Sequence, residues 1–197
     1  MLSHHFPIAI FKDRVENTDV IRGITMPWVE EEYEKNPCSF DNPWDNDLFT
    51  TYGRDVGFDW QSVLSLFIPS IEKMAQELCL NGRAAINTAW LNAYKTGQSH
   101  DLHDHLPSQF AAIYYLKFNP EVHSPAVFVN PYRQGSLSSA PRDVDPMNTH
   151  PQWTLQSLVP VEEGDLLIFP GFLEHRVPRQ QSDELRVTLS FNFSMIP

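Results

Sequence analysis

The half of the chain that follows Gly82 is a succession of short apolar, β-branched and aromatic segments separated by turn residues. Such segments are typical of strands. Turn pairs such as Asn119-Pro120 and Pro170-Gly171 mark points where the chain reverses. Many short strands with short turns predict antiparallel sheets closed on each other, and a jelly roll is the natural closure. The predicted strands are residues 84–94, 110–118, 126–130, 153–158, 165–169 and 185–193.

The N-terminal part of the chain is predicted to contain a strand followed by a helix. An apolar run at residues 6–11 suits an edge strand, where Pro7 is tolerated because an edge N–H needs no partner. Residues 18–35 have the pattern of a helix. Pro27 lies inside this segment, so we expect it to kink or end the helix near Met26.

A second helix is predicted from Gln61, because apolar residues recur at three- and four-residue spacing until Asn81-Gly82 ends the pattern, with a kink expected at Pro69. Between the helices, residues 36–59 are rich in proline, glycine and aromatic residues, which predicts an ordered loop that walls the active site. Residues 135–151 lack an apolar period and are interpreted as a mobile insertion, a lid. We expect a single domain over 1–197, with a supporting region at 1–82 and a jelly-roll core at 83–197.

Composition narrows the classes of partner. The formal net charge is −11, from 14 Lys+Arg and 25 Asp+Glu, which disfavours a nucleic-acid partner and leaves a small-molecule or peptidyl substrate. No apolar run approaches the ~20 residues that span a bilayer, and the N-terminus does not resemble a signal peptide. A cytoplasmic protein without a membrane partner is therefore expected. Cys38 and Cys79 are far apart and outside C-x-x-C spacing, which predicts two reduced thiols.

Histidines are concentrated in the segment Ser99-His100-Asp101-Leu102-His103-Asp104-His105, and His175 follows much later. Side chains alternate between the two faces of an extended strand. His103 and His105 are therefore expected on one face, together with Asp101. The opposite face is expected to carry His100, Leu102 and Asp104.

Two close imidazoles and a distant third form a ligand set that suits zinc, copper, iron or nickel. Three protein ligands leave coordination positions open for water, oxygen or substrate, as in catalytic metal sites. The segment therefore predicts a catalytic metal centre. The alternative interpretation is a solvated polar loop.

A strand after His175 places Arg186, Thr188 and Ser190 on one face. An arginine directed into the interior of a jelly roll needs an anionic partner, and its planar fork suits bidentate binding of a carboxylate. The hydroxyl of Thr188 can add a hydrogen bond to the same group. The alternative is an arginine on an exposed strand face.

The order of these elements resembles the 2-oxoglutarate/Fe(II)-dependent dioxygenases, specifically the prolyl-hydroxylase-like branch, whose core is a cupin-like double-stranded β-helix. The resemblance covers roughly residues 90–193. The run from Leu167 to Val177, the segment Trp90-Leu91-Asn92 and the H-x-H pair are similar to a group of bacterial and phage-associated oxygenases of this type.

The resemblance implies roles for individual residues. His103 and His105 take the place of the family's H-x-D/E pair and His175 that of the distal histidine. Arg186 and Thr188 take the place of the R-x-S/T pair that holds the far carboxylate of the cosubstrate. The residues placed beside the cosubstrate would be Tyr94, Tyr115 and Asn92.

The resemblance also implies a reaction: an oxidoreductase with Fe(II), 2-oxoglutarate as cosubstrate and O2. Such an enzyme would hydroxylate a C–H bond of a peptidyl or small-molecule substrate and release succinate and CO2. This chain departs from the family at His105, where most members have Asp or Glu. A local bulge could bring Asp104 to the metal instead, and Asp101 could orient a ligand imidazole.

Two other functions fit the same residues. A three-His cupin dioxygenase would use the same ligands without 2-oxoglutarate, but it would have no need of Arg186. A nonenzymatic jelly-roll binding or structural protein would carry the histidines incidentally. A homodimer through the N-terminal strand and helices is a further expectation. The remaining histidines, interpreted as surface or loop residues, are His4, His5, His123 and His150.

Overall fold

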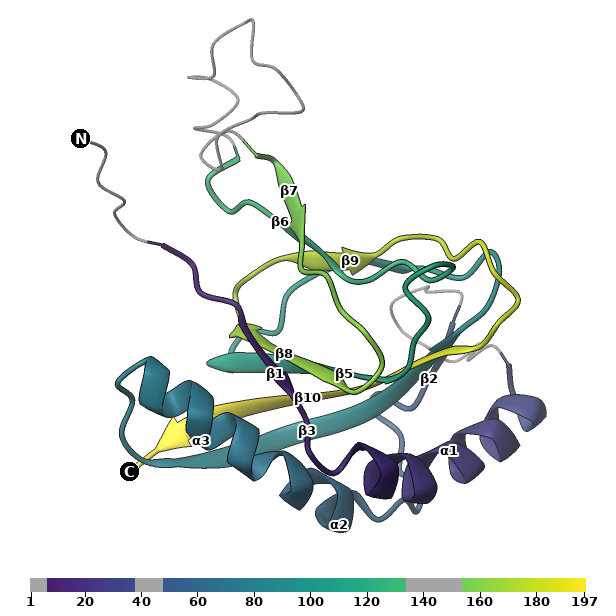
Figure 1. Ribbon diagram of the computed structural model, residues 1–197, viewed down its shortest axis with the longest axis horizontal. Coiled ribbons are helices and arrows are strands. Elements are labelled where there is room, and N and C mark those ends of the chain that lie inside the picture. The colour runs from purple at the N-terminus through teal and green to yellow at the C-terminus, as the bar shows by residue number, and fades with distance from the viewer. Residues whose placement is uncertain (1–6, 38–47, 134–153) are drawn as a thin grey trace, which may run out of the picture.

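A computed structural model of the protein describes residues 7–37, 48–133 and 154–197. In these residues two antiparallel sheets face each other, and three helices cover the outer face of the larger sheet (Figure 1). Figure 1 labels the helices α1 Thr18–Lys35, α2 Trp60–Leu64 and α3 Ile68–Glu77. The strands are β1 Phe11–Arg14, β2 Phe49–Thr50, β3 Arg83–Tyr94, β4 His100–His103, β5 Phe110–Lys117, β6 Val127–Val129, β7 Gln156–Leu158, β8 Asp165–Pro170, β9 His175–Val177 and β10 Arg186–Ile196.

The topology is that of a double-stranded β-helix, which confirms the predicted fold class. The larger sheet has the order β1-β8-β5-β10-β3-β2 and the smaller sheet the order β4-β9-β6-β7. From β3 to β10, consecutive strands alternate between the sheets, as in a jelly roll, except for β6 and β7, which pair as neighbours in the smaller sheet. Strands β1 and β2, which come from the N-terminal region, close the two edges of the larger sheet.

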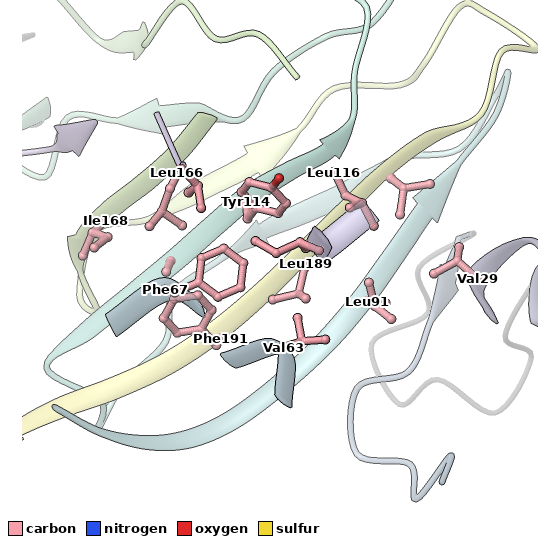
Figure 2. Close-up of a cluster of buried hydrophobic side chains, with 14 of the residues drawn as sticks. Val29, Val63, Phe67, Leu91, Tyr114, Leu116, Leu166, Ile168, Leu189 and Phe191 are labelled. Atoms are coloured by element: carbon pink, nitrogen blue, oxygen red, sulfur yellow. The ribbon is translucent and has the colours of Figure 1, made fainter. Parts of the chain in front are cut away.

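The main hydrophobic core lies between the larger sheet and the helices (Figure 2). Phe67, in the 3₁₀ turn between α2 and α3, packs against Tyr114 of β5 at 5.0 Å and Phe191 of β10 at 5.3 Å between ring centroids. All three rings are fully buried. Burial of each such side chain stabilises the fold by roughly 1.5–3 kcal/mol, so the helices are held by the sheet face that they cover.

Helix α1 differs from the prediction at Pro27, because the helix continues through this residue to Lys35. Proline removes one hydrogen bond to the carbonyl four residues earlier, here Gly23. Both Pro27 and Gly23 are exposed, so water can satisfy that carbonyl. The buried face of the helix, which includes Ile21 and Val29, stays intact and holds the helix to the sheet.

The helix predicted from Gln61 is divided by the 3₁₀ turn Ser65–Phe67. Pro69 lies in the first turn of α3, where its missing N–H would have no helical partner. Gly82 then allows the turn into β3, since its φ is +114° and a Cβ there would lie 2.3 Å from the carbonyl oxygen of Ile196. The break therefore falls where proline is favourable. The predicted stop at Asn81-Gly82 is wrong in position, because the helix ends at Glu77 and the left-handed residue that follows it is Cys79, with a φ of +54°.

The first strand lies later than predicted, at Phe11–Arg14 rather than residues 6–11. It pairs with β8, and its two basic side chains form ion pairs with the buried Asp165. The short strands β2 and β9 were not among the predicted segments, because each has only two or three residues in the ladder. No helix in the described residues is long and apolar enough to cross a membrane.

Two predicted segments are only partly or not at all described. Within the expected aromatic loop 36–59, residues 38–47, with Cys38, lie outside the described residues. Its later part is ordered: Phe49 is buried, and the ring of Tyr52 meets Trp90 edge to face at 5.1 Å. The expected insertion 135–151 lies wholly outside the described residues. Cys79 is a free, exposed thiol.

Candidate metal centre and anion pocket

Three histidines from separate elements meet at one point of the smaller sheet. His103 of β4 and His175 of β9 are direct partners in the strand register. His105 follows β4 in a loop, and its Nε2 lies 3.3 Å from Nε2 of His175. One ring nitrogen from each histidine lies within 4.8 Å of the others, which is close enough for a single metal ion to reach all three.

Gly171 is what lets the loop of His105 approach the sheet. The backbone N–H of His105 donates to the carbonyl of Gly171 at 2.7 Å, and the N–H of Gly171 donates to the carbonyl of Gln109 at 2.8 Å. A Cβ on Gly171 would lie 2.1 Å from the carbonyl oxygen of Ser108, which is an impossible contact. The Pro170-Gly171 turn read from the sequence therefore also positions one of the three histidines.

Backbone carbonyls fix the orientation of two of the rings. Nδ1 of His103 donates to the carbonyl of Asp101 at 2.7 Å, and Nδ1 of His175 donates to the carbonyl of Leu173 at 3.1 Å. Because a carbonyl can only accept, the proton in each neutral ring lies on Nδ1 and the lone pair on Nε2. The free Nε2 lone pair is what a metal ion needs.

The environment also keeps the imidazoles uncharged. Burial, and then the charge of His103, lowers the pKa of His105 to about 3. Burial lowers the pKa of His103 and, together with repulsion from its neighbours, takes the pKa of His175 well below its usual value. Neutral imidazoles are metal ligands, whereas protonated ones are not. At neutral pH the site therefore offers three free donors.

The two aspartates of the segment lie outside this group. Asp104 is exposed, and its carboxylate caps the following turn by accepting from the N–H of Leu106 at 3.1 Å. Among the described residues, the three histidines form the only group of potential ligands close enough to share an ion. Asp101 orients His103 as the sequence suggested, and it does so through its backbone carbonyl.

His100 was predicted to face away from His103, and this prediction is wrong. The pairing of β4 with β9 shifts register between His100 and His103: three residues of β4 span the distance that two span on β9. This bulge turns His100 toward the site, where its ring stacks on that of His103 at 4.1 Å between centroids. Burial, and then the charges of its neighbours, lowers the pKa of His100 to about 3. Strict alternation cannot reveal such a residue.

Arg186 occupies an unusual environment: its side chain is only 1% exposed and has no carboxylate partner among the described residues. Nε donates to the carbonyl of Ser124 at 3.1 Å, while both terminal nitrogens are buried and find no hydrogen-bond acceptor in the described part of the chain. A buried guanidinium with two unused donors is costly unless an anion completes it. The position therefore predicts a bound carboxylate.

Aromatic rings and polar groups complete the surroundings of this arginine. The guanidinium lies over the ring of Tyr94 at 4.7 Å and that of Tyr115 at 5.5 Å. Burial raises the pKa of Tyr94 to about 12, so its hydroxyl stays protonated. Tyr115 accepts from the N–H of Ala126 at 3.2 Å through its hydroxyl oxygen. Asn92 is buried, and its Oδ1 has no hydrogen-bond partner among the described residues.

One narrow pocket connects the arginine to the histidines. His103, His105, His175 and Arg186 all line it. Asn92, Tyr94 and Thr188 line the same pocket, as do residues that were not predicted as site residues, including His100 and Trp90. A metal ion at the histidines and a carboxylate at the arginine would therefore lie in a common space. The donor set fits a metal ion chelated by a small dicarboxylate.

His123 was interpreted as a surface or loop residue, and this is wrong with respect to burial. Its side chain is 4% exposed, Nδ1 accepts from the N–H of Asn119 at 3.0 Å and Nε2 donates to the carbonyl of Glu184 at 3.0 Å. It joins the loop after β5 to the loop before β10. Its role is structural, and no spacing in the sequence predicts its burial. The expected surface residues His4, His5 and His150 lie outside the described residues.

The comparisons with known proteins agree with this geometry. A family model described as "Putative 2OG-Fe(II) oxygenase" matches residues 88–192, which is more than half of the chain. This chain belongs to the 2OG-Fe(II) oxygenase family. A search of curated proteins finds none that matches.

Solved structures of the same fold belong to varied oxygenases. A prolyl-4-hydroxylase of Pseudomonas putida shares 12% identity at a TM-score of 0.59, covering 96% of this chain and 94% of its own. A prolyl hydroxylase of Trichoplax adhaerens in complex with a peptide fragment of hypoxia inducible factor shares 13% at 0.57, covering 94% and 83%. HygX of Streptomyces hygroscopicus, with nickel and 2-oxoglutarate bound, shares 13% at 0.53, covering 95% and 83%.

Family membership confirms the predicted enzyme class. The protein is an Fe(II)- and 2-oxoglutarate-dependent oxygenase whose cofactors are Fe(II), 2-oxoglutarate and O2. The three-histidine cluster and the anion pocket lie inside the matched residues. The structural similarity supports the fold, and the low identity leaves the substrate to be argued from this chain's own residues.

Proposed function

We propose that the enzyme hydroxylates a C–H bond of a peptidyl or small-molecule substrate and that its catalytic centre is the pocket described above. His103, His105 and His175 would hold Fe(II) through their Nε2 atoms. Arg186 and Thr188 would bind the far carboxylate of 2-oxoglutarate, with Tyr94, Tyr115 and Asn92 around it. When bound, these groups and O2 supply the oxidising chemistry, which converts 2-oxoglutarate to succinate and CO2.

The observation that carries the proposal is the unpaired guanidinium of Arg186 in the same pocket as three neutral imidazoles. A three-His oxygenase that did not use 2-oxoglutarate would gain nothing from this buried charge, and it would incur the cost of desolvation. A nonenzymatic jelly roll would have no need of either feature. A dicarboxylate that reaches from the metal to the arginine accounts for both.

The residues of this chain have separable tasks in the proposed reaction. The carbonyls of Asp101 and Leu173 hold two imidazoles in the ligating tautomer. Tyr94 and Tyr115 stay protonated, so neither adds a negative charge that would compete for Arg186. The surrounding rings exclude water from the guanidinium, which strengthens its attraction for a carboxylate. The protein thus orients the reactants and keeps the pocket dry.

We assign the second metal ligand to His105 rather than Asp104. The reasons are the 3.3 Å between the Nε2 atoms of His105 and His175 and the use of the Asp104 carboxylate as a turn cap. Three neutral ligands leave the charge of the ion to be balanced by 2-oxoglutarate, a dianion. Binding of iron and cosubstrate is therefore expected to be strongly cooperative.

The proposal includes a cytoplasmic enzyme whose substrate is neither a nucleic acid nor a membrane component. A net charge of −11 opposes binding to polyanions. The Trichoplax prolyl hydroxylase is described with a peptide fragment, which makes a peptidyl substrate one reasonable class. Homodimerisation through the N-terminal strand and helices stays a prediction.

The test is an anaerobic titration of the metal-free protein with Fe(II) and then 2-oxoglutarate, followed by visible absorption. The wild type is expected to develop a charge-transfer band that saturates with 2-oxoglutarate. Arg186→Met keeps most of the side-chain volume and removes the guanidinium, so it should need far more 2-oxoglutarate or show no band. Arg22→Ala, which removes an exposed arginine paired with Glu163, is the matched control and should behave as wild type.

The outcomes separate the three candidate functions. Iron binding without a band in the wild type would contradict the use of 2-oxoglutarate at this site and favour a three-His oxygenase. The absence of iron binding would favour a nonenzymatic jelly roll. His103→Gln and His175→Gln should each abolish iron binding, while circular dichroism confirms that the variants fold.

A further inference from the structure

A second, wider cavity opens on the outer side of the histidines. It is a groove of about 440 Å³ between β3 of the larger sheet and β4 of the smaller sheet. Trp90, His100, His103 and His105 line both this groove and the inner pocket, so they form the wall between them. A molecule in the groove would lie beside the metal centre without displacing a ligand of Arg186. The groove is the natural position for a substrate.

One side of the groove is shaped by a β-bulge in β3. Asn192 of β10 pairs with Thr88, but the next residue, Phe193, pairs with Ile86, so Asn87 is the extra residue. Strict alternation would send Asn87 and Thr88 to opposite faces of the sheet. The bulge instead lets both consecutive residues line the groove.

The other side of the groove is shaped by the bulge in β4. It lies at the start of a continuous run, residues 100–108, that lines the groove. Bulges re-aim side chains and are frequent next to active sites. Two bulges that face one cavity from opposite sheets indicate that the cavity is a built recognition site rather than a gap between the sheets.

Asn192 at the floor of the groove has an unmet hydrogen-bonding group. Its side chain is 6% exposed, and its amide oxygen is buried without a partner among the described residues. A buried acceptor without a donor is costly, and most such groups in proteins are satisfied. Asn192 therefore points to a hydrogen-bond donor supplied by the molecule that fills the groove.

The charge of the groove favours a neutral or positively charged occupant. Among the described residues that line it, the carboxylates are those of Asp101 and Asp104, both exposed, and none is a lysine or arginine. The remaining wall combines apolar side chains, including Tyr52 and Leu106, with uncharged polar ones, including Asn87 and Thr88. A phosphate or carboxylate here would be repelled, while an amide, hydroxyl or ammonium group would be attracted.

Unpaired strand edges flank the groove along its length. Leu91 of β3 exchanges hydrogen bonds with Thr51 at 3.0 Å and 2.9 Å, but in the described residues no strand pairs with this edge of β3 before Leu91. On the opposite side, β4 is the first strand of its sheet, and within the ranges that the structure describes it pairs only with β9. Open edges present alternating N–H and C=O groups, which an extended peptide can match.

We infer that this groove binds the substrate as an extended polypeptide segment, with neutral or basic side chains beside Asp101 and Asp104 and a donor on Asn192. The inference rests on the proposed function, because it places the segment against the histidine wall of the metal centre. It narrows the substrate from a peptidyl or small molecule to a peptide. It also assigns specificity to residues that hold neither metal nor cosubstrate.

The test uses three pools of degenerate ten-residue peptides that differ only in charge, enriched in Lys/Arg, in neutral residues or in Asp/Glu. A mixture of the corresponding free amino acids represents small molecules. Binding of fluorescein-labelled pools to the metal-free protein is measured by anisotropy. The loaded enzyme is then assayed for succinate release and for a 16 Da mass increase of the peptides.

The basic and neutral pools are expected to bind and to stimulate succinate release, with the acidic pool at least tenfold weaker. Asn192→Ala should weaken peptide binding about fivefold, as expected for the loss of one hydrogen bond. The double substitution Asp101→Asn with Asp104→Asn should reduce the preference for basic over acidic peptides about fivefold to tenfold. Asn can still cap the turn at residue 104, which limits the effect on folding.

The control double substitution Glu72→Gln with Glu77→Gln removes two exposed carboxylates from α3, on the other side of the larger sheet, and should leave the preference unchanged. Stimulation by free amino acids but by no peptide pool would overturn the inference, as would equal binding of all pools. A normal charge-transfer band in the same preparation would show that the proposed function stands. Loss of that band would instead contradict the proposed function itself.

Discussion

The two faces of strand β10 are equally buried but chemically opposite. One face carries Val187, Leu189, Phe191 and Phe193, all in the hydrophobic core under the helices. Figure 2 shows two of them, Leu189 and Phe191. The other carries Arg186, Thr188, Ser190 and Asn192, each no more than 6% exposed. Four of the six buried polar atoms without partners in the described residues belong to the second face or to its neighbour Asn92.

This difference teaches that burial has two purposes in one strand. The apolar face is complete in the free protein, because every side chain on it meets other side chains. The polar face is incomplete, because its donors and acceptors point into cavities. The apolar face therefore stabilises the free protein, whereas the polar face adds to the free energy of unfolding only when a ligand is bound.

The largest effect is expected on the apolar face. Phe191→Ala removes a fully buried ring that contacts Phe67, so the free energy of unfolding should fall by about 3–5 kcal/mol. Urea unfolding of the metal-free protein measures it. The folded fraction should keep the charge-transfer band with Fe(II) and 2-oxoglutarate. A loss below about 1 kcal/mol would mean that the two faces do not differ in this way.

The second prediction concerns completion of the polar face. Addition of 2-oxoglutarate at 100 times its dissociation constant to the Fe(II)-loaded protein should raise the free energy of unfolding by about 2.7 kcal/mol under anaerobic conditions. Thermal denaturation of the Fe(II)-loaded protein with and without 2-oxoglutarate measures the gain. Phe191→Ala should gain as much as wild type, whereas Arg186→Met should gain little from 2-oxoglutarate. Equal gains in both variants would contradict the assignment of Arg186.

The third prediction is that removal of the unpaired charge stabilises the free protein. Arg186→Met replaces a buried guanidinium, whose terminal nitrogens lack partners, with an apolar side chain, so the metal-free form should gain about 1–3 kcal/mol. Urea unfolding without ligands measures it. A destabilised variant would show that the arginine serves the fold rather than a ligand.

The smallest effect is expected from Ser190→Ala. Ser190 lies on the polar face and lines the inner pocket, and its substitution removes one small hydroxyl. Unfolding should change by less than about 1 kcal/mol, in contrast to Phe191 next to it. The same urea experiment compares the two neighbours directly. Similar losses for both would remove the distinction between the faces.

The sequence predicted those features that depend on local periodicity. Alternation along Arg186, Thr188 and Ser190 places them on one face, and the structure agrees. The strand segments after Gly82 were recognisable because turn residues separate them. The family could be inferred from the spacing of the histidines and the arginine, and the family model confirms it.

Features that depend on a partner strand or on a distant loop could not be predicted. The bulges at Asn87 and before His103 exist only relative to β10 and β9, so His100 was placed on the wrong face. The burial of His123 arises from contacts with the loop at Glu184. Helix α1 tolerates Pro27 because the affected carbonyl is exposed, which depends on how the helix docks.

The three histidines differ in the kind of backbone that carries them. His103 and His175 lie opposite each other in a ladder, while His105 lies in a loop held by Gly171. The backbone of a residue in a ladder cannot shift to suit a side chain of another length without disturbing the paired strand, but the backbone of a loop residue can. If His105 is the second ligand, as proposed, that position is thus the more adaptable one, where a shorter carboxylate or a longer imidazole could each reach the ion. This chain's departure from the usual Asp or Glu would then occur where the backbone is a loop rather than a ladder.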